Sequence, residues 1–529
     1  MPSSSLEPQW LAARGHEARG ELDAARDIYE SVLRGDPSQA FAWHRLSALA
    51  AIQGRHRDAR DAAMQGTAVA VANRRWKILP YLTRQLLGFD EREAVRRAIA
   101  AADWTDPAIL AQSAVLAQQL WLADDHTQGL RLADHALHVA PRSHRLHYVR
   151  ANLLRHLGRA EEATLAFEQA IALAPGFAEA HWALAHHAVA AAPGERVPRV
   201  RAALAHASAE QADPMRATYL GYALFKELDA AGDTEAAWEA LAAAAAGMRR
   251  QLHYDAAAER ATLDALRAGF AAPEPAPPLG ASPSTPIFVV GMPRTGTTVL
   301  ERILGNHGRV ADAGELNAFG ASMSLALDQS FASPPTARQV AAASAMDLGA
   351  VGAMYLERTA ALRGDRAFLV DKNPLNAFNA GFIARALPQA KILCLVREPM
   401  DACFSNLKEL FPGGGYGYSY DLAELAGHWR RFRDLVGHWR AMLPGRFMAV
   451  EYEALVTEPA RVAAEVMAFC GLEFEPSSID ITRNTAPVST ASSSQVRSPI
   501  HRGGIGAWRR YERQLAPLVE MLGDGTGGG

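Results

Sequence analysis

A sequence period of 34 residues governs the first half of this 529-residue chain. Pro107, Pro141 and Pro175 are 34 positions apart, and the last two follow the ends of apolar patterns with helical spacing. Segments that begin at Gly20 ("GELDAARDIYESVL") and Gly54 ("GRHRDARDAAMQGT") have the same offset. A fixed period with a small residue at the turn position predicts a repeated helix–turn–helix unit.

Residues 142–175 contain the clearest copy of this unit. Apolar residues fall on one helical face before Gly158 and on another face after it: Leu146, Val149, Leu153 and Leu157, then Ala163, Phe167, Ala170 and Leu173. The unit resembles the tetratricopeptide repeat. Because one such unit cannot bury both faces alone, neighbouring units must stack on it.

Other parts of the helical region fit the period less well. Residues 72–105 and 176–270 keep helical patterning but lose the register, so a generic helical bundle is the alternative to a repeat array. A degenerate copy is expected from Gly232, in "GDTEAAWEAL". We expect an all-α tetratricopeptide-repeat solenoid over residues 1–270.

The pattern changes after a proline-rich stretch. Residues 271–286 contain six prolines and are expected to form an extended linker. Short β-branched runs then alternate with helical ones ("IFVVG", "FLVDK", "KILCLV", "RFMAVEY"), which predicts a parallel sheet with helices on both faces over 287–515. Residues 516–529 end in "GDGTGGG" and are expected to be a flexible tail.

Composition sets the broad class of protein. With 49% hydrophobic and 21% charged residues and a net charge of −3, the chain is typical of a globular protein and not of a general nucleic-acid binder. Its three cysteines lie in apolar segments without metal-ligand spacing, which indicates buried thiols in a reducing compartment. The N-terminus lacks a secretory pattern and no apolar run is long enough to cross a membrane, so we expect a cytoplasmic protein without a membrane partner.

The segment "GMPRTGTT", residues 291–298, has the outline of a phosphate-binding loop between a strand and a helix. Backbone N–H groups and the positive end of the helix dipole favour an anion there. Arg294 adds a guanidinium inside the loop, and Thr297 and Thr298 add hydroxyl groups. Thr297 stands where nucleotide triphosphatases carry a lysine, which favours a ligand with one phosphate at this end.

The loop resembles the one that holds the 5′-phosphosulfate of 3′-phosphoadenosine-5′-phosphosulfate in sulfotransferases, above all in the protein-tyrosine sulfotransferase branch. Three further stretches are similar to that branch: "VADAGEL", "LVREPMDACFSNL" and "VEYEALVTEP", which carry Glu315, Arg397 with Ser405, and Tyr452. The resemblance covers about 287–515 and implies a three-layer α/β domain with a P-loop-like phosphate site.

The resemblance also implies catalytic roles. Glu315 is the general base that takes the proton of the acceptor hydroxyl, while Arg294 and Lys372 stabilise charge on the transferring group. Ser492 matches a serine that helps to stabilise the transition state. His307 is an alternative base, although a histidine at a helix end is more often a cap. No metal is needed.

Binding of the sulfuryl donor is implied for two groups of residues. The loop residues Arg294, Thr295, Gly296, Thr297 and Thr298 would hold the 5′ side. A second group would hold the 3′-phosphate and the nucleotide: Arg397, Ser405 and Tyr452.

The chain departs from the branch at two places. Lys408 and Glu409 stand where the branch often adds an arginine, and Ala507 stands where it carries a lysine. Arg502 or Arg509 could supply the missing charge.

These inferences predict a sulfotransferase whose acceptor is tyrosine in a protein or peptide, docked on the repeats. A small alcohol, phenol or glycan is the alternative acceptor, with the repeats as a protein-interaction module. A non-catalytic repeat scaffold is the third possibility. No nucleic-acid partner is expected, and the oligomeric state is left open.

Overall fold

The computed structural model describes residues 6–187, 192–209, 213–274, 284–411, 413–484 and 498–523. A long helical region precedes a domain built on a five-stranded parallel sheet, as the sequence predicts. The change from helices to strands falls between residues 269 and 285. The division into compact units falls elsewhere: one unit comprises 1–157 with 320–331, and the other comprises 158–319 with 332–529.

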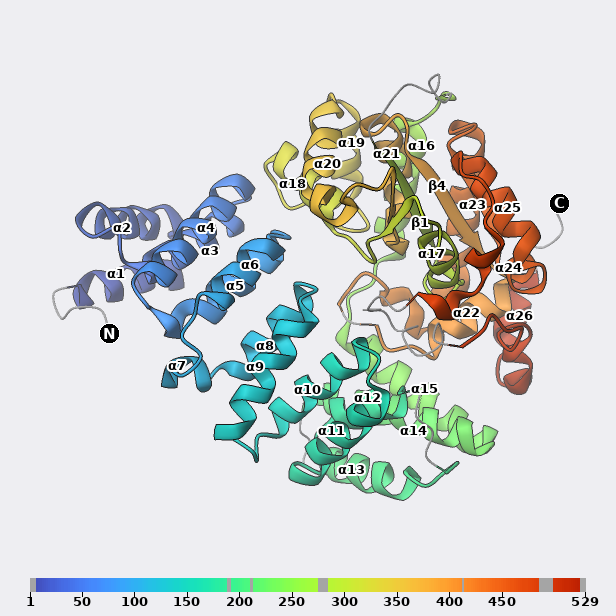
Figure 1. The fold of residues 1–529 in the computed structure, drawn as a ribbon, viewed down its shortest axis with the longest axis horizontal. Coiled ribbons are helices and arrows are strands. Elements are labelled where there is room, and N and C mark those ends of the chain that lie inside the picture. Colours follow the sequence, from blue (N-terminus) through green and yellow to red (C-terminus); the bar gives the residue numbers. More distant parts are fainter. Residues whose placement is uncertain are drawn as a thin grey trace. The chain divides into compact units, whose positions relative to one another are not determined.

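Pairs of helices build the first unit, and most of these helices pack against the next along the chain (Figure 1). Trp10, Tyr29 and Val32 are part of the buried cluster between the first pairs. The helices are α1 (Glu7–Ala18), α2 (Leu22–Gly35), α3 (Ala40–Ile52), α4 (His56–Ala72), η1 (Trp76–Ile78), α5 (Leu79–Gly88), α6 (Arg92–Ala100), α7 (Pro107–Leu110), α8 (Ser113–Leu122), α9 (His126–Val139) and α10 (His144–His156).

The predicted period is present in the backbone. Second helices of successive pairs begin at residues 22, 56, 92, 126 and 160, which are 34, 36, 34 and 34 positions apart. Each follows a residue with positive φ: Gly20, Gly54, Asp90, Asp124 and Gly158. Glycine, and less readily aspartate, tolerates this left-handed conformation. Residues 72–105 therefore keep the repeat with two added residues, in place of the predicted loss of register.

In the second unit a further set of helices precedes the sheet: α11 (Ala160–Leu173), α12 (Ala178–Ala185), α13 (Val197–Ala209), α14 (Pro214–Ala231), α15 (Thr234–Gln251) and α16 (Ala256–Gly269). Helices α14 and α15 form a hairpin that turns at Gly232, where φ is 81°. This hairpin is the degenerate copy expected there.

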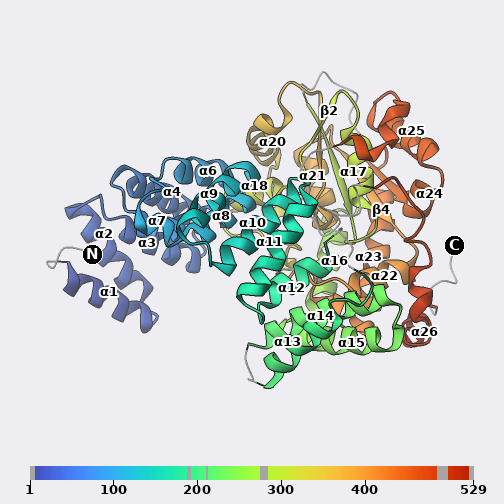
Figure 2. The same ribbon diagram turned by 60° about the horizontal axis from the view of Figure 1, so that its bottom comes forward.

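The α14–α15 hairpin is fastened to the sheet domain, and it lies beside helix α22 (Pro399–Leu407) in Figure 2. The hydroxyl of Tyr222 donates a hydrogen bond of 3.2 Å to the carbonyl oxygen of Leu407. The hydroxyl of Tyr511 donates one of 2.7 Å to Asp229. Arg249 binds both oxygens of Glu424 at 2.7 Å. The last helices of the helical region are thus part of the support of the sheet domain.

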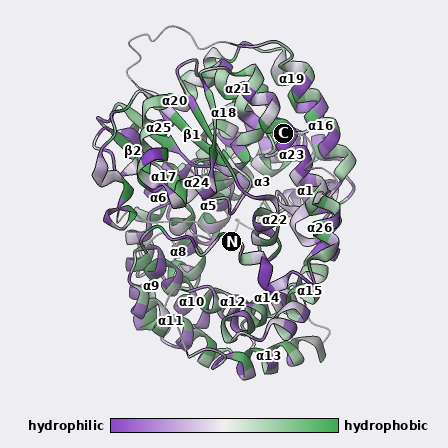
Figure 3. Cartoon of the chain, turned by 90° about the vertical axis from the view of Figure 1, so that its right-hand side faces the viewer, coloured by the Kyte–Doolittle hydropathy of each residue, from purple (hydrophilic) through white to green (hydrophobic). Residues whose placement is uncertain are grey.

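All five strands are parallel and run in the order β2-β3-β1-β4-β5. They are β1 (Thr285–Gly291), β2 (Val310–Asp312), β3 (Phe368–Asp371), β4 (Lys391–Val396) and β5 (Phe447–Glu451). The central strand β1 is buried from residue 286 onward and is strongly hydrophobic in Figure 3. Its neighbour β4 is buried from residue 392 to residue 395.

Helices cover both faces of the sheet, as predicted. Ile287 and Val289 belong to a core shared with α17 (Thr297–Gly305) and α25 (Pro459–Cys470). Phe288, which points to the other face, has its ring 5.4 Å from that of Tyr355 in α20 (Gly349–Arg363). The alternation follows from the two-residue period of a strand.

Helix α18 (Ala318–Leu327) belongs mostly to the first unit. The remaining helices of the second unit are α19 (Ala337–Ser344), η2 (Pro374–Asn379), α21 (Ala380–Ala386), η3 (Gly417–Tyr420), α23 (Leu422–Met442), α24 (Tyr452–Thr457), η4 (Pro476–Ile479), η5 (Ile481–Arg483), η7 (Ala507–Tyr511) and α26 (Ala516–Gly523). None of the described helices is long and apolar enough to cross a membrane.

The predicted tail from residue 516 needs a correction. Residues Ala516–Gly523 form helix α26, in which Leu518 and Leu522 are buried. These two leucines, four positions apart, share one helical face and give the segment an apolar anchor that its glycine-rich ending hides. Residues 524–529 lie outside the described part of the chain.

Candidate active site

The ends of the five strands define the site. Each strand is followed within four residues by a residue that the sequence analysis selected: Glu315 after β2, Lys372 after β3, Arg294 after β1, Arg397 after β4 and Tyr452 after β5. Carboxyl ends of parallel strands meet at one edge of the sheet, which is where open α/β sheets bind ligands. The fold therefore brings all five residues to one edge.

The loop between β1 and α17 has the backbone conformation of an anion-binding turn. Gly296 is the N-cap of α17 with φ of 95°, and Arg294 has φ of 66°. The hydroxyl of Thr295 donates a 2.8 Å hydrogen bond to the carbonyl oxygen of Met292, which closes the turn. Gly291 is required as well, because a Cβ atom there would lie 2.8 Å from the carbonyl oxygen of Leu395.

Gly296 has a packing role that the sequence did not reveal. A Cβ atom at this position would lie 2.5 Å from Cδ2 of Tyr452. Tyr452 is the first residue of α24 and is itself buried. The close approach at Gly296 is therefore made by a tyrosine ring, and it joins the loop to the end of β5.

Arg397 is held from several sides. Its Nη1 atom donates hydrogen bonds to the carbonyl oxygen of Arg294 at 2.8 Å and to the hydroxyl of Ser405 at 3.3 Å. Its Nη2 atom donates to the carbonyl oxygen of Gly504. The guanidinium carbon lies 4.5 Å from the centre of the Tyr452 ring, a cation–π distance. The structure thus places the predicted pair, Arg397 and Ser405, in direct contact.

These side chains open onto one cavity of about 170 Å³. Six predicted residues line it: Arg294, Gly296, Thr298, Arg397, Ser405 and Tyr452. Lys408, His501, Gly504 and Ala507 also contribute, together with Val299, Val456, Ile481, Pro499, Ile500 and Gly503. Thr295 and Thr297 are buried at 2% and 5% exposure and are not among its lining residues, so their side chains shape the loop. Three basic side chains give the cavity the electrostatics of an anion site.

Lys408 and Glu409, where the chain departs from the branch, have distinct roles. Lys408 lines the cavity, and burial, assisted by the nearby charges of Lys226 and Arg294, lowers its pKa to about 8. The carboxylate of Glu409 lies 3.5 Å from Nε of Arg294. Lys408 therefore adds a basic group to the cavity, while Glu409 orients the loop arginine.

A second group of charges lies at the ends of β2 and β3. Lys372 is 1% exposed; its Nζ atom donates a hydrogen bond to Oε1 of Glu315 and lies 4.0 Å from Oε2 of Glu301. Burial lowers the pKa of Lys372, but the carboxylates of Glu315 and Glu301 outweigh it and raise the pKa above its ordinary value. Lys372 therefore stays protonated, next to a Glu315 side chain that is 44% exposed.

Burial also acts on Glu301, in helix α17. It raises the pKa of this carboxyl well above its ordinary value, even though the charge of Lys372 opposes the shift. Burial thus favours the neutral form of Glu301. Glu315, whose oxygen accepts the hydrogen bond from Lys372, is the nearer of the two carboxylates that balance this lysine.

Two site-supporting residues were missed by the sequence analysis. Asp401, 2% exposed, accepts hydrogen bonds from the backbone N–H of Gly506 at 2.6 Å and of Trp508 at 3.4 Å. Asn406 donates a 2.9 Å hydrogen bond to the carbonyl oxygen of Pro293. Both lie on the helix that carries Ser405. Their polar side chains in an apolar segment were the available signal, but their partners are about 100 positions away.

The other candidates lie elsewhere. His307 is buried, and its ring nitrogens contact the backbone of Glu473 and of Arg309, which gives it a structural role at the end of α17. Arg502 donates to the carbonyl oxygen of Thr457, and Arg509 stacks on Trp508. Among the described residues, neither arginine lines the cavity beside Ala507. Ser492 lies in 485–497, outside the described residues.

Within the described ranges, no group of three or more histidine, cysteine, aspartate or glutamate side chains is placed to hold a metal ion. The three cysteines are free and buried. Burial raises the pKa of the Cys470 thiol to about 12, so this side chain is an unreactive thiol at neutral pH.

Comparison with known proteins agrees with the geometry. Residues 286–476 match the sequence profile of the Sulfotransferase family. An uncharacterized protein of Aquifex aeolicus is 31% identical over 58% of this chain, which spans 41% of that relative's length. A putative protein-tyrosine sulfotransferase of Caenorhabditis briggsae is 23% identical, over 45% of this chain and 89% of the relative.

Among solved structures, the sulfotransferase domain from the curacin biosynthetic pathway is similar to this chain. The two are 17% identical over 45% of this chain and 98% of that one, with a TM-score of 0.31. The match over 286–476 includes the phosphate loop, Glu315, Lys372, Arg397, Ser405 and Tyr452. It confirms that this region of the chain resembles the Sulfotransferase family.

Proposed function

We propose that the protein transfers the sulfuryl group of 3′-phosphoadenosine-5′-phosphosulfate to an acceptor hydroxyl. The observation that carries the proposal is the single cavity that joins the β1 loop to Arg397, Ser405 and Lys408. Two clusters of anion-binding groups on one cavity suit a ligand with phosphate at two positions. The family match over residues 286–476 supports the same activity.

In this proposal the loop binds the 5′-phosphosulfate. Backbone N–H groups of residues 294–298, the N-terminus of α17 and the guanidinium of Arg294 surround it. Arg397, Ser405 and Lys408 bind the 3′-phosphate. Tyr452 contacts the nucleotide from the end of β5, where it also holds Arg397 and Gly296 in place.

The reaction needs a base and a source of positive charge. The acceptor oxygen forms a bond to sulfur while the bond from sulfur to the bridging phosphate oxygen breaks. The proton of the acceptor hydroxyl passes to the carboxylate of Glu315. Lys372, held at Glu315, and Arg294 stabilise the negative charge on the transferring group and on the leaving phosphate. The products are a sulfate ester and adenosine 3′,5′-bisphosphate.

Tyrosine in a protein or peptide is the acceptor that we propose. Distant relatives that are called protein-tyrosine sulfotransferases support it, at 21 to 23% identity. A phenol has a pKa of about 10 in water, so it gains from a nearby carboxylate base. A small phenol, alcohol or glycan is the second candidate, and the repeats would then bind a protein partner.

An acceptor panel tests the proposal. The full-length protein would be incubated with donor carrying radioactive sulfur and with a tyrosyl peptide, a free phenol or a glycan. We expect label in the peptide at a kcat/KM at least about tenfold above that for the phenol, since binding of the rest of the peptide lowers the barrier. Label in the phenol or glycan alone would favour the second candidate. No transfer to any acceptor would contradict the proposed activity.

A further inference from the structure

The two helices of each repeat in the first unit differ in what they expose. The first helices are α1, α3, η1 with α5, α8 and α10, and we call their exposed side the first-helix face. Six of the seven large hydrophobic residues that are exposed in the described part of this unit lie on these helices: Leu11, Phe41, Ile52, Tyr81, Val115 and Leu122. The seventh, Val139, ends a second helix, α9. Exposed apolar residues gathered on one side mark an interaction surface.

Three of these six residues, Leu11, Tyr81 and Val115, occupy equivalent repeat positions, and Arg45 takes that position in the repeat between Leu11 and Tyr81. Leu11, Arg45, Tyr81 and Val115 are separated by 34, 36 and 34 residues, which are the spacings of the second helices themselves. Arg14 and Arg84 follow Leu11 and Tyr81 by three residues, so each lies beside its neighbour on the helix surface. Equivalent positions in stacked repeats form a continuous stripe, and such stripes are the binding surfaces of repeat proteins.

Aromatic rings connect part of this stripe from one repeat to the next. The rings of Trp10 in α1 and Phe41 in α3 have centres 5.2 Å apart. His44 follows at 6.2 Å from Phe41 and lies 6.0 Å from Tyr81 in α5. Phe41 and Tyr81 are 40% and 56% exposed. The rings therefore form a row across three repeats whose outer edges reach solvent.

Charge is also distributed unequally. The first helices carry seven lysine or arginine residues and two acidic ones: Arg14, Arg45, Lys77, Arg84, Arg145, Arg150 and Arg155, with Glu7 and Glu17. The second helices α2, α4, α6 and α9 carry eight basic and seven acidic residues: Arg26, Arg34, Arg57, Arg60, Arg92, Arg96, Arg97 and Arg131, with Asp23, Asp27, Glu30, Asp58, Asp61, Glu93 and Asp134. The first helices are thus net basic, and the second helices are close to neutral.

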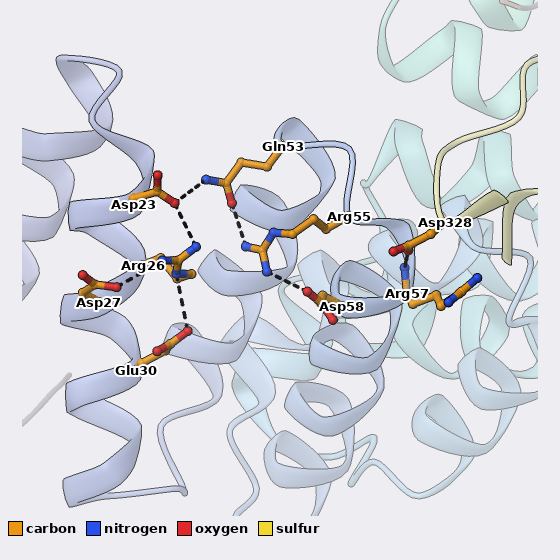
Figure 4. A network of polar contacts seen from close by, with 9 residues as sticks. All are labelled: Asp23, Arg26, Asp27, Glu30, Gln53, Arg55, Arg57, Asp58 and Asp328. Atoms are coloured by element: carbon orange, nitrogen blue, oxygen red, sulfur yellow. Dashed lines mark hydrogen bonds and ion pairs between the residues drawn. The ribbon is translucent and has the colours of Figure 1, made fainter. Parts of the chain in front are cut away.

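Five of the eight second-helix arginines form ion pairs within the unit, as Figure 4 shows for Arg26. Arg26 contacts Asp23, Asp27 and Glu30. In the turn before α4, Arg55 pairs with Asp58 at 2.6 Å. Arg57 forms no ion pair among the described residues, but its side chain donates hydrogen bonds to the backbone carbonyls of Leu325 and Ala326.

The first-helix face lacks such partners at four positions. Arg14, Lys77, Arg84 and Arg145 are exposed, and within the described residues none of them forms an ion pair. Unpaired cations interleaved with exposed apolar side chains are complementary to an anionic, partly apolar ligand.

We propose that the first-helix face binds an acidic segment of a peptide, with apolar side chains of that segment against Leu11, Tyr81 and Val115. The inference rests on the proposed function, because the segment would belong to the protein acceptor. The aliphatic side chains of Leu11 and Val115 suit the apolar side chains of a peptide, whereas the exposed rings of Phe41 and Tyr81 are of the kind that stack on bases, so an oligonucleotide is the competing ligand in the test. The effect is to raise the local concentration of acceptor tyrosines at the enzyme.

Fluorescence anisotropy with the full-length protein tests the inference. The probe is a labelled peptide of about 15 residues in which glutamates and two leucines flank one tyrosine, and its counterpart has lysine in place of every glutamate. We expect the acidic peptide to bind at least about tenfold more tightly, and more weakly at high salt because screening reduces the attraction. The double variant Arg14→Glu with Arg84→Glu should weaken binding by about tenfold or more.

A matched control comes from the second helices. Arg34 and Arg131 are also exposed and without an ion pair among the described residues, so Arg34→Glu with Arg131→Glu should change the affinity by less than about twofold. Circular dichroism would verify that each variant keeps its helicity. Equal losses in both sets, no binding of the acidic peptide, or tighter binding of a single-stranded oligonucleotide would overturn the inference.

The inference and the proposed function can fail separately. Sulfuryl transfer to a free phenol by a protein that does not bind the acidic peptide would overturn the inference and leave the activity standing. Binding of the acidic peptide with the predicted charge dependence, by a protein that transfers sulfate to nothing, would support the docking surface and refute the activity. The same protein preparation serves both measurements.

Discussion

Positive charge is arranged differently in two parts of the site, one beside β1 and β4 and the other beside β2 and β3. At the ends of β1 and β4, Arg294 and Arg397 face one cavity, together with Lys408 from the C-terminal end of α22. At the ends of β2 and β3, Lys372 is buried and neutralised by Glu315. An excess of positive charge at an open cavity is suited to anion binding, whereas a balanced pair is suited to moving a proton without a large change in net charge. In the proposed function, the first part binds the nucleotide and the second takes the proton of the acceptor.

Glu315→Gln is expected to have the largest effect. It should impair the chemical step and leave nucleotide binding intact. Because the amide cannot accept the acceptor's proton, kcat should fall by about 10²- to 10⁴-fold. Affinity for adenosine 3′,5′-bisphosphate should stay within about twofold, since Glu315 does not line the nucleotide cavity. Steady-state kinetics and calorimetric titration check the two parts.

The matched control is Glu357→Gln, an exposed carboxylate on α20. Its kinetics should equal those of the wild type. A Glu315→Gln protein that keeps full activity would remove Glu315 as the base.

Arg397→Ala is expected to weaken nucleotide binding. Loss of a guanidinium that contacts an anion costs about 2 kcal/mol, so adenosine 3′,5′-bisphosphate should bind roughly 30-fold more weakly. The change also removes the contacts to Arg294, Ser405 and Gly504, which makes this a lower limit. Arg440→Ala, on the exposed side of α23, is the control. Near-wild-type affinity of Arg397→Ala would place the nucleotide elsewhere.

The two parts of the site were not equally visible in the sequence. Glu315, Lys372, Arg397 and Tyr452 each follow a strand, and strands are recognisable from their β-branched runs, so their place at one edge follows from the parallel sheet. The contact between Gly296 and Tyr452 joins residues 156 positions apart and depends on the path of the chain after β4. The backbone conformation of a phosphate loop already explains a glycine at this position. The sequence therefore gives no sign that the glycine also packs against a distant tyrosine.

The helical region was likewise predictable only in part. Its period was visible wherever glycine marked the turn, as at Gly20, Gly54 and Gly158. It was missed at 72–105, where Asp90 takes the positive φ and two residues are added. The support that Asp401 gives to residues 506–508 is likewise a tertiary contact, which no local pattern announces.

The pH dependence of nucleotide binding tests the role of Lys408 in the cavity. Lys408, with a pKa near 8, is mostly protonated at pH 7 and loses its charge as the pH rises. A bound phosphate favours the charged form, so affinity should fall by about tenfold between pH 7 and pH 9. In Lys408→Met this decline should disappear. Titrations at three pH values test it, and a persistent decline in the variant would assign the titration to another group.

Asp401→Asn gives the smallest expected effect, because it acts through the wall of the cavity. The amide retains one acceptor oxygen, so one of the two backbone hydrogen bonds to residues 506–508 is weakened. A loss of about 1 kcal/mol, or roughly fivefold in nucleotide affinity, should follow, with kcat nearly unchanged. A selective loss of kcat would instead mean that this wall contacts the reacting group.

Truncation is a poor substitute for these variants. Removal of residues 1–270 would also remove α14 and α15, whose Tyr222 and Arg249 bind Leu407 and Glu424 of the sheet domain. Loss of activity would then follow from damage to α22, which carries Ser405. Point substitutions on the first-helix face avoid this ambiguity.

The central claim is that one cavity holds two phosphate positions. Calorimetric titration of the wild-type protein with adenosine 3′,5′-bisphosphate and with adenosine 5′-monophosphate tests it most directly. The bisphosphate should bind at least about tenfold more tightly, because only it reaches Arg397, Ser405 and Lys408 as well as the β1 loop. Equal affinities, or no binding of the bisphosphate, would contradict the claim.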